Sequence, residues 1–387
     1  MFTRSSTSKG SSSTGRLRRI RAAIYSNAFS RFSLTIKKTA STHPSIYQKQ
    51  AERVFALTDA PMPVEFDSET LETVGVADWD QDLGHTSSAH PHYDDYMFNY
   101  VTEFSRNSTY KIYRMPEDDR QREVFSEIDT KLPSYVHSFG LTENHVVFVE
   151  FPYVIDPKEL LLHNRPFARN LEWRPDIGTR FFLVDRESGD VKREMETEPF
   201  FAYHHINAWE DGDEVVVDLT RYDGPQAINA YYLDEIESEE FCVSGGIPHR
   251  YRLGVEDVEK ERLTDVPLEL PRINYDYNTR DYRYVYGVGH QENPYREFPN
   301  RLLKLDVKEK ETVVWEDENS YPSEPVFVES PAEDEEDEGV VLSVVIDLEQ
   351  EKSFLVVLDA EEFTELGRAT VDHGIPYPLH GQFYDGL

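Results

Sequence analysis

The chain has 387 residues, and its 74 Asp and Glu residues outnumber its 40 Lys and Arg residues, which gives a formal charge of −34 at pH 7. Such an acidic surface repels phosphate backbones, so the composition argues against general nucleic-acid binding. Hydrophobic residues make up 39% of the chain and aromatic residues 13%, which is enough for a sizeable core. The single cysteine, Cys242, excludes an intramolecular disulfide and favours a reducing compartment.

Charge divides the chain near residue 50. Residues 1–50 contain no Asp or Glu and carry +10, whereas residues 51–387 carry −44. We expect residues 1–50 to be a basic leader that is disordered or unrelated to the folded part, although such a segment is also typical of a transit peptide. The excess of carboxylates in residues 51–387 is typical of proteins dissolved in molar salt, which screens their repulsion. The sequence therefore predicts a halophilic microbe as the source.

Short segments rich in β-branched and aromatic residues predict β-strands along the folded part. They follow in chain order at residues 146–150, 180–185, 214–219 and 340–346. Turn sequences rich in Gly and acidic residues punctuate the chain at 187–190, 210–213 and 223–225. No long stretch has an apolar period of 3.6 residues, so helices should be few and short.

The spacing of these strands, without βαβ alternation, predicts an all-β sandwich, barrel or propeller. A weak repeat favours the propeller: a strand ends on an acidic turn, as in residues 182–185, 303–307 and 355–359. The acidic run 333–339 clusters carboxylates as calcium sites do, but it lacks the alternating ligands of a calcium loop. We expect a solvated hairpin loop there.

Histidine is the residue type that points to chemistry, because the sequence has no phosphate-binding loop and no nucleophile elbow. Four of the 13 histidines stand in well-defined contexts: His90, His137, His204 and His380. Their separations of 47, 67 and 176 residues match no local metal motif, and a lone histidine is more often hydrogen-bonded in a core than bound to a metal. In a propeller, however, inner strands of distant blades lie side by side along one axis.

Five segments carry a family pattern in the same order: residues 137–150, 204–210, 270–275, 321–327 and 375–383. Together they resemble the carotenoid cleavage oxygenases, the group that includes the retinal-forming dioxygenases and the vertebrate retinoid isomerase. The resemblance extends from about Arg53 to the C-terminus. It implies a seven-bladed β-propeller with a non-haem ferrous ion, Fe(2+), on its axis and a tunnel that guides a polyene across the metal.

The resemblance implies that the iron ligands, and hence the catalytic residues, are His90, His137, His204 and His380. The family pattern Phe-His-x-x-Asn-Ala selects His204 over its neighbour His205. Four neutral imidazoles suit ferrous iron and leave coordination positions free for dioxygen and the alkene.

Each ligating imidazole also needs a partner for its other ring nitrogen, which fixes the tautomer and orientation of the ring. The resemblance assigns this role to Asp59, Glu269 and Glu324; without the motifs, the two glutamates would be read as surface residues of an acidic protein. The family usually has glutamate in the position of Asp59. Because aspartate is one methylene shorter, we expect its bond to a histidine, by analogy His137, to be stretched or bridged by water.

The N-terminal part departs from the family pattern. Family members carry further residues before the segment that matches Arg53, with a Leu-x-Gly-x-x-x-Arg-Asn-Gly-Pro-like stretch and a Trp-Phe-Asp-Gly-like stretch from the first blade. Neither stretch is found in this sequence. We therefore expect an N-terminally truncated propeller that lacks its first blade.

The predicted function is that of an iron(II)-dependent dioxygenase that cleaves a conjugated double bond of a carotenoid or apocarotenoid to aldehydes, with conversion of β-carotene to retinal as the preferred reaction. The predicted partners are the carotenoid, O2 and, by peripheral contact, a membrane that supplies substrate to a cytoplasmic enzyme. Two alternatives stay open: a truncated, catalytically inactive propeller, and a stilbene-cleaving dioxygenase, whose phenol-binding Tyr and Lys pair cannot be placed. Iron content separates the enzyme from an inactive scaffold.

Overall fold

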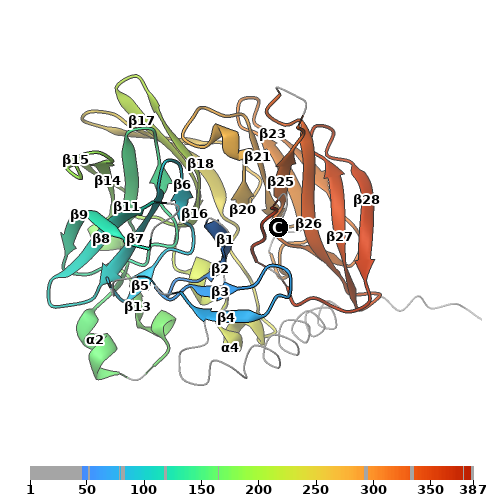
Figure 1. Ribbon diagram of the computed structural model, residues 1–387, viewed down its shortest axis with the longest axis horizontal. Coiled ribbons are helices and arrows are strands. Elements are labelled where there is room, and N and C mark those ends of the chain that lie inside the picture. Colours follow the sequence, from blue (N-terminus) through green and yellow to red (C-terminus); the bar gives the residue numbers. More distant parts are fainter. Residues whose placement is uncertain are drawn as a thin grey trace, which may run out of the picture.

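Antiparallel β-sheets of four or five strands stand side by side around a common centre (Figure 1). The computed structural model describes residues 53–77, 79, 83–116, 120–163, 165–291, 295–331, 335–377 and 379–384, and the backbone of residues 46–50. Within these ranges there are six such sheets, which we number in chain order.

Sheets 1 to 3 are formed by the first half of the described chain. Sheet 1 contains β1 (Ile46–Gln50), β2 (Arg53–Leu57), β3 (Val64–Phe66) and β4 (Thr73–Val76). Sheet 2 contains β5 (Thr86–Ser87), β6 (His92–Tyr93), β7 (Met97–Glu103), β8 (Ser108–Met115) and β9 (Glu123–Thr130). Sheet 3 contains β10 (Gly140–Leu141), β11 (His145–Glu150), β14 (Thr179–Asp185) and β15 (Val191–Thr197).

Sheets 4 to 6 complete the set. Sheet 4 contains β16 (Phe201–Asp211), β17 (Glu214–Tyr222), β18 (Ile247–Leu253) and β19 (Val258–Arg262). Sheet 5 contains β20 (Glu269–Arg272), β21 (Tyr284–Gly289), β22 (Arg301–Asp306) and β23 (Glu311–Trp315). Sheet 6 contains β24 (Ser320–Pro322), β25 (Val326–Glu329), β26 (Gly339–Asp347), β27 (Lys352–Asp359) and β28 (Glu365–Val371).

The remaining elements are short and lie in the connections. A two-stranded ribbon pairs β12 (Tyr153–Ile155) with β13 (Leu171–Trp173). The α-helices in the described ranges are α2 (Pro157–Leu162), α3 (Gln226–Asn229) and α4 (Leu233–Ile236), and the 3-10 turns are η1 (Phe167–Asn170), η2 (Pro175–Ile177) and η3 (Tyr275–Tyr277). The expectation of few and short helices therefore holds for this part of the chain.

The prediction of an all-β propeller is confirmed, but the described residues form six blades and not seven. Residues 1–45, to which the prediction assigned most of the basic leader, lie outside the described residues. The backbone of residues 46–50 pairs with β2 as strand β1, so sheet 1 begins before the boundary predicted at residue 51.

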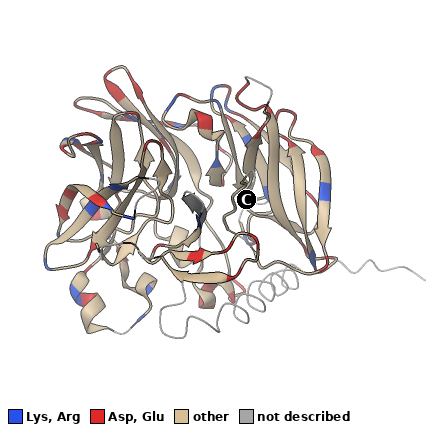
Figure 2. Cartoon of the chain, in the orientation of Figure 1, with Lys and Arg blue, Asp and Glu red and all other residues tan. Residues whose placement is uncertain are grey.

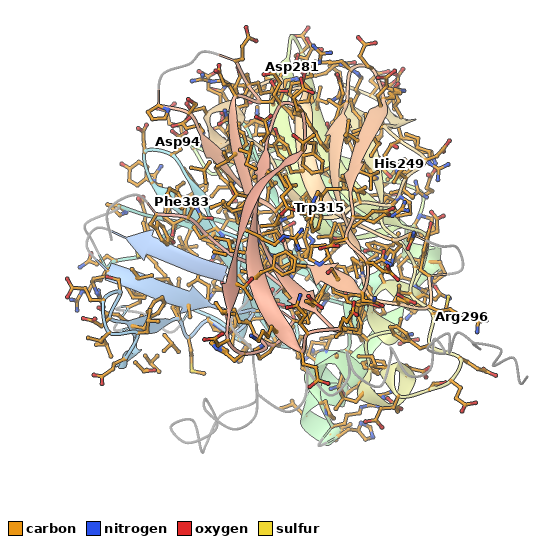
Figure 3. All side chains as sticks on the ribbon, turned by 90° about the vertical axis from the view of Figure 1, so that its right-hand side faces the viewer. Asp94, His249, Asp281, Arg296, Trp315 and Phe383 are labelled. Carbon is orange, nitrogen blue, oxygen red and sulfur yellow. The ribbon has the colours of Figure 1, made fainter. Side chains whose placement is uncertain are left out.

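The strands form because apolar residues fill both faces of the inner sheets. In β11, Val147, Phe148 and Val149 are fully buried, and their cluster joins sheets 2, 3 and 4. Strands covered on both faces have continuous apolar sequences, which is why this segment was recognisable. Trp315, labelled in Figure 3, is buried in another cluster that joins sheets 5 and 6. Stacked sheets thus share continuous cores, which fixes the positions of the inner strands.

Charged residues are concentrated on loops and outer strands, as Figure 2 shows. The acidic run 333–339 was expected to form a solvated hairpin loop. It lies between β25 and β26, as a hairpin loop does, but its described residues bond to sheet 5 instead of being fully solvated. Glu336 accepts the backbone N–H groups of Arg283 and Tyr284, each at 2.7 Å. Asp337 is bonded to the buried Lys304 ammonium at 2.5 Å. Two of its carboxylates therefore hold neighbouring sheets together. In the ranges that the structure describes, no helix is long and apolar enough to cross a membrane.

Candidate metal centre

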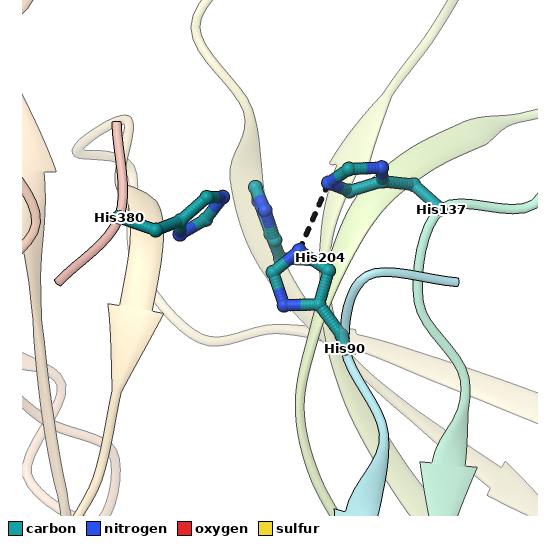
Figure 4. Close-up of side chains that lie close together, drawn as sticks. All are labelled: His90, His137, His204 and His380. Carbon is teal, nitrogen blue, oxygen red and sulfur yellow. Dashed lines mark hydrogen bonds between the residues drawn. The ribbon is translucent and has the colours of Figure 1, made fainter. Parts of the chain in front are cut away.

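Four histidines from distant parts of the chain meet at the centre of the propeller (Figure 4). His90 lies in the loop between β5 and β6, His137 between β9 and β10, His204 on β16, and His380 in the segment that follows β28. One ring nitrogen of each histidine lies within 4.8 Å of the corresponding nitrogen of the others. The four residues predicted as ligands are therefore brought together, which the spacing in the sequence alone could not establish.

The inner nitrogens of this cluster face one another. His90 Nε2 and His137 Nε2 are 3.0 Å apart, and the His204 ring centroid lies 5.0 Å from that of His90. His204 Nε2 is buried and has no hydrogen-bond partner among the described residues. A separation of 3.0 Å is what two nitrogens have when both bind one ion at about 2.1 Å and at about a right angle. The arrangement thus fits a metal ion better than a network of hydrogen bonds.

Two irregularities in β16 aim His204 at the centre. The pairing with β17 shifts register between Ala202 and His205, and again between His205 and Asn207. Such bulges re-aim side chains and recur next to active sites. His205 faces away from the cluster, since its Nδ1 is 2.9 Å from the Ser138 hydroxyl. His92 is also held outside the cluster, where its Nε2 lies 2.8 Å from the Phe139 carbonyl oxygen.

Glu269 holds the outer nitrogen of His204. The His204 Nδ1 to Glu269 Oε2 distance is 2.6 Å, the shortest of the three carboxylate to histidine bonds in the cluster. The same carboxylate accepts the hydroxyl groups of Thr220 and Tyr222, each at 2.8 Å, and the backbone N–H of Leu270 at 2.8 Å. Leu270 has a φ of 50°, a left-handed conformation that is strained for leucine. The backbone is therefore bent so that Glu269 is fully bonded and its charge is aimed at His204.

Glu324 holds the outer nitrogen of His380 in the same way. Its Oε1 lies 3.0 Å from His380 Nδ1, and its Oε2 accepts the backbone N–H of Gly381 at 3.0 Å. Both side chains are only 3% exposed, so this is the most deeply buried of the three pairs. The carboxylate consequently fixes both the imidazole and the backbone of the C-terminal segment that carries it.

Asp59 is the partner of His137, but its bond is long. Asp59 Oδ2 lies 3.2 Å from His137 Nδ1, as expected for the shorter side chain. The hydroxyl of Tyr135 fills the gap: it donates to Asp59 Oδ2 at 2.8 Å and lies 3.2 Å from His137 Nδ1. The Asp59 carbonyl also accepts the Ser87 N–H at 2.8 Å, which ties the loop from sheet 1 to the strand that precedes His90.

The electrostatics of the cluster favour charged carboxylates and neutral imidazoles at His90 and His204. At His137 burial acts in the same direction, but the charges of Asp59 and Glu269 outweigh it and raise the pKa. Burial and the neighbouring rings hold the pKa of His90 well below its ordinary value, and burial lowers the pKa of His204 although Glu269 opposes it. Burial alone would raise the pKa values of Asp59, Glu269 and Glu324, but their hydrogen-bonded and positive neighbours outweigh it and lower all three. Neutral imidazoles present lone pairs, which is the form that binds a metal.

Arg272 adds one positive charge beside the cluster. Its guanidinium is buried, donates to the Gln382 side chain, and lowers the pKa of Glu324. Three carboxylates and one guanidinium leave two negative charges among these groups when the imidazoles are neutral. Uncompensated buried charge is costly. A divalent cation at the imidazole nitrogens would balance it.

Comparisons with known proteins decide the family. The family model described as retinal pigment epithelial membrane protein (RPE65) matches residues 2–385. The β,β-carotene 15,15'-dioxygenase of Gallus gallus is 31% identical over 93% of this chain and 78% of its own length. The mitochondrial carotenoid-cleaving dioxygenase of Mustela putorius furo is 31% identical over 92% of this chain and 77% of its own length. The chain belongs to the carotenoid oxygenase family. The family resemblance predicted from the sequence motifs is confirmed.

Solved structures agree with this assignment at the level of the fold. Cobalt-substituted apocarotenoid oxygenase from Synechocystis superposes with a TM-score of 0.79 at 22% identity, over 87% of this chain and 73% of that one. A chimera of that oxygenase with RPE65 gives a TM-score of 0.77 over 86% and 72% of the two chains, also at 22% identity. The names of the curated relatives bear out the prediction of a dioxygenase enzyme of this family.

Sequence reasoning missed the residues that support the carboxylates. Tyr135 stands two residues before His137, so in extended backbone both side chains lie on one side, a signal that was available. Thr220 and Tyr222 alternate in the same way on β17, next to the strand of His204. Arg272 had no such signal, because only the folded chain places it beside Glu324.

Proposed function

We propose that the four histidines bind one iron(II) ion and that the protein is an iron-dependent carotenoid cleavage dioxygenase. The observation that carries the proposal is the convergence of four imidazoles whose outer nitrogens, in three cases, are held by carboxylates. Imidazole donors suit iron, zinc, copper and nickel alike, so the choice of iron rests on the family. The net charge of the surrounding groups supports a divalent ion.

The reaction proposed is the splitting of one conjugated carbon–carbon double bond by O2. Each of the two carbons receives one oxygen atom, so two aldehydes form and no other reductant is needed. Bound iron would supply the activation of dioxygen. The residues of this chain hold the imidazoles rigid, and the rings of Tyr135 and Tyr203 pack against His137 and give the centre an aromatic border. Such a border suits an apolar polyene.

The preferred substrate is β-carotene, whose central cleavage gives two molecules of retinal. This choice rests on the names of the relatives, which include β,β-carotene 15,15'-dioxygenases. Those names also favour carotenoids over stilbenes, and an enzyme over an inactive scaffold. Iron-loaded protein should be incubated with β-carotene and with an apocarotenal, and the products identified by mass. Retinal from β-carotene supports the proposal, and the absence of any aldehyde from either substrate in protein that retains its iron contradicts it.

We also propose that substrate is taken up by peripheral contact with a membrane, in the cytoplasm. The side chains of Leu161 and Leu162, at the end of α2, are 87% and 73% exposed. Exposed apolar side chains on a short surface helix are suited to insertion between lipids. Co-sedimentation with liposomes should fall when both leucines are replaced by glutamate, and unchanged co-sedimentation would refute this use of α2.

A further inference from the structure

The three carboxylate to histidine bonds of the centre differ in length. They measure 2.6 Å for Glu269 with His204, 3.0 Å for Glu324 with His380, and 3.2 Å for Asp59 with His137. A distance of 3.2 Å is the long limit for a hydrogen bond between nitrogen and oxygen. On its own, the Asp59 bond would hold its imidazole less firmly than the other two.

The hydroxyl of Tyr135 stands where a longer acid would reach. It has one proton, which it donates to Asp59 Oδ2 at 2.8 Å, and its oxygen then faces His137 Nδ1 at 3.2 Å with a free lone pair. A tyrosine hydroxyl carries its proton at neutral pH, so the phenol is available as a donor. The His137 N–H therefore faces three oxygens at the same distance of 3.2 Å, the two carboxylate oxygens of Asp59 and the phenol oxygen of Tyr135.

We propose that Tyr135 is a positioning residue of the metal centre and that Asp59 and Tyr135 together do what a single glutamate would do. The inference rests on the proposed metal centre. Tyr135 is itself held in place: its backbone N–H donates to the Tyr153 carbonyl at 2.8 Å, and its ring stacks on Phe201 at 6.1 Å. Phe201 belongs to β16, the strand of His204, so Tyr135 also links two of the ligand segments.

The proposal makes the two side chains interdependent. With Tyr135 in place, a glutamate at position 59 must compete with the phenol for the same space, because the gap that its extra methylene would fill is already occupied. Removing the hydroxyl by Tyr135→Phe leaves the His137 N–H with only the long bond to Asp59. In the double variant, the glutamate at position 59 is long enough to accept the His137 N–H by itself, and the missing hydroxyl of residue 135 leaves space for its carboxylate.

The test is a double-mutant cycle on metal affinity, with iron(II) as the probe under anaerobic conditions and cobalt(II) as its air-stable substitute. The variants are Tyr135→Phe, Asp59→Glu and the double variant, each assayed by chelator competition and by the rise in melting temperature on metal addition. Tyr153→Phe is the matched control, since it removes a tyrosine hydroxyl that bonds Asn229 at 2.9 Å and contacts none of the four imidazoles. Wild-type protein that binds neither metal would refute the proposed centre itself, a result separate from any difference among variants.

Each single variant should bind metal about 10-fold more weakly, in line with the usual effect of losing a partner of a metal-ligating histidine. The metal affinity of the double variant should recover to within about 3-fold of the wild-type value, and that of Tyr153→Phe should stay within about 2-fold of it. Both differences are small compared with the loss of about 10-fold expected of each single variant. The melting temperature of the metal-free protein should change no more in Tyr135→Phe than in Tyr153→Phe. Unchanged affinity in Tyr135→Phe, or a double variant as weak as the two single effects multiplied, would overturn the proposal.

Discussion

Replacing Glu269 by glutamine separates the charge of this side chain from its hydrogen bonds. The carboxylate accepts four hydrogen bonds, from His204 Nδ1, the Leu270 N–H and the hydroxyls of Thr220 and Tyr222. A glutamine can keep its oxygen toward His204 and Leu270 and turn its amide toward the two hydroxyls, which can rotate to accept. The variant Glu269→Gln therefore removes the negative charge and leaves the network in place.

The main effect expected of Glu269→Gln is weaker metal binding. Losing the charged partner of a ligating histidine weakens metal affinity by about 10- to 100-fold, which corresponds to roughly 1.4 to 2.7 kcal/mol. Glu269→Ala should weaken binding at least as much and should also destabilise the metal-free protein by about 3 kcal/mol or more, because several buried donors lose their acceptor. Chelator competition measures the first effect and urea unfolding of the metal-free protein measures the second.

The exposed Glu194, which pairs with Arg180 on sheet 3, provides the control. Glu194→Gln should leave metal affinity unchanged, because the charge lies far from the centre in well-screened solvent. The reasoning would be refuted if Glu269→Gln bound metal as tightly as the wild type. It would also be refuted if the glutamine and alanine variants destabilised the metal-free protein equally.

Three further predictions concern stability. Hydrogen bonds from His145, Thr142 and Asn144 outweigh burial and lower the pKa of Glu210 to about 2. Because solvent screens this partly exposed carboxylate, it should contribute about 1 to 2 kcal/mol above pH 4.5 that is lost as the pH falls toward 2. Glu210→Gln should be less stable than the wild type at pH 7 and nearly as stable at pH 2, and equal stability at both pH values would contradict this. The charge of −34 predicts a melting temperature that rises steeply between about 0.1 M and molar KCl, and indifference to salt would argue against adaptation to high salt. Asp218 is fully buried and accepts two hydrogen bonds from the Arg250 guanidinium, at 2.8 and 2.9 Å. Asp218→Ala should therefore lower the free energy of unfolding, measured by urea titration, by about 3 to 5 kcal/mol. A loss below about 1 kcal/mol, the value of an exposed ion pair, would show that the contact is solvated.

Strand positions were predictable because the inner sheets are buried on both faces. The apolar run at residues 146–150 became β11, and residues 340–346 became the middle of β26. The boundaries were less accurate: β26 extends to Asp347, since a strand in the middle of a sheet gains a hydrogen bond for each residue added. Strand β1 was missed because its five residues, Ile46–Gln50, have no regular apolar alternation.

The candidate site was predictable in its residues and not in its geometry. The motifs identified four histidines and three acids, but local sequence could not show that His204 needs two bulges in β16 to reach the centre. The strained backbone at Leu270 depends on the packing around Glu269, which no pattern of residue types encodes. The long bond of Asp59 was expected from the length of its side chain, whereas Tyr135 was missed although its position two residues before His137 was a usable signal.

The most direct test of the account is the iron content of the purified protein, measured by mass spectrometry after loading with iron(II) and dialysis. If His90, His137, His204 and His380 share one ion, the wild type should retain about one iron per chain and His204→Ala should lose most of it. His205→Ala is the matched control, because His205 neighbours His204 in the chain and faces Ser138 instead of the cluster. Iron retained in His205→Ala and lost in His204→Ala is the predicted result, and equal iron content in the wild type and His204→Ala would contradict the metal centre.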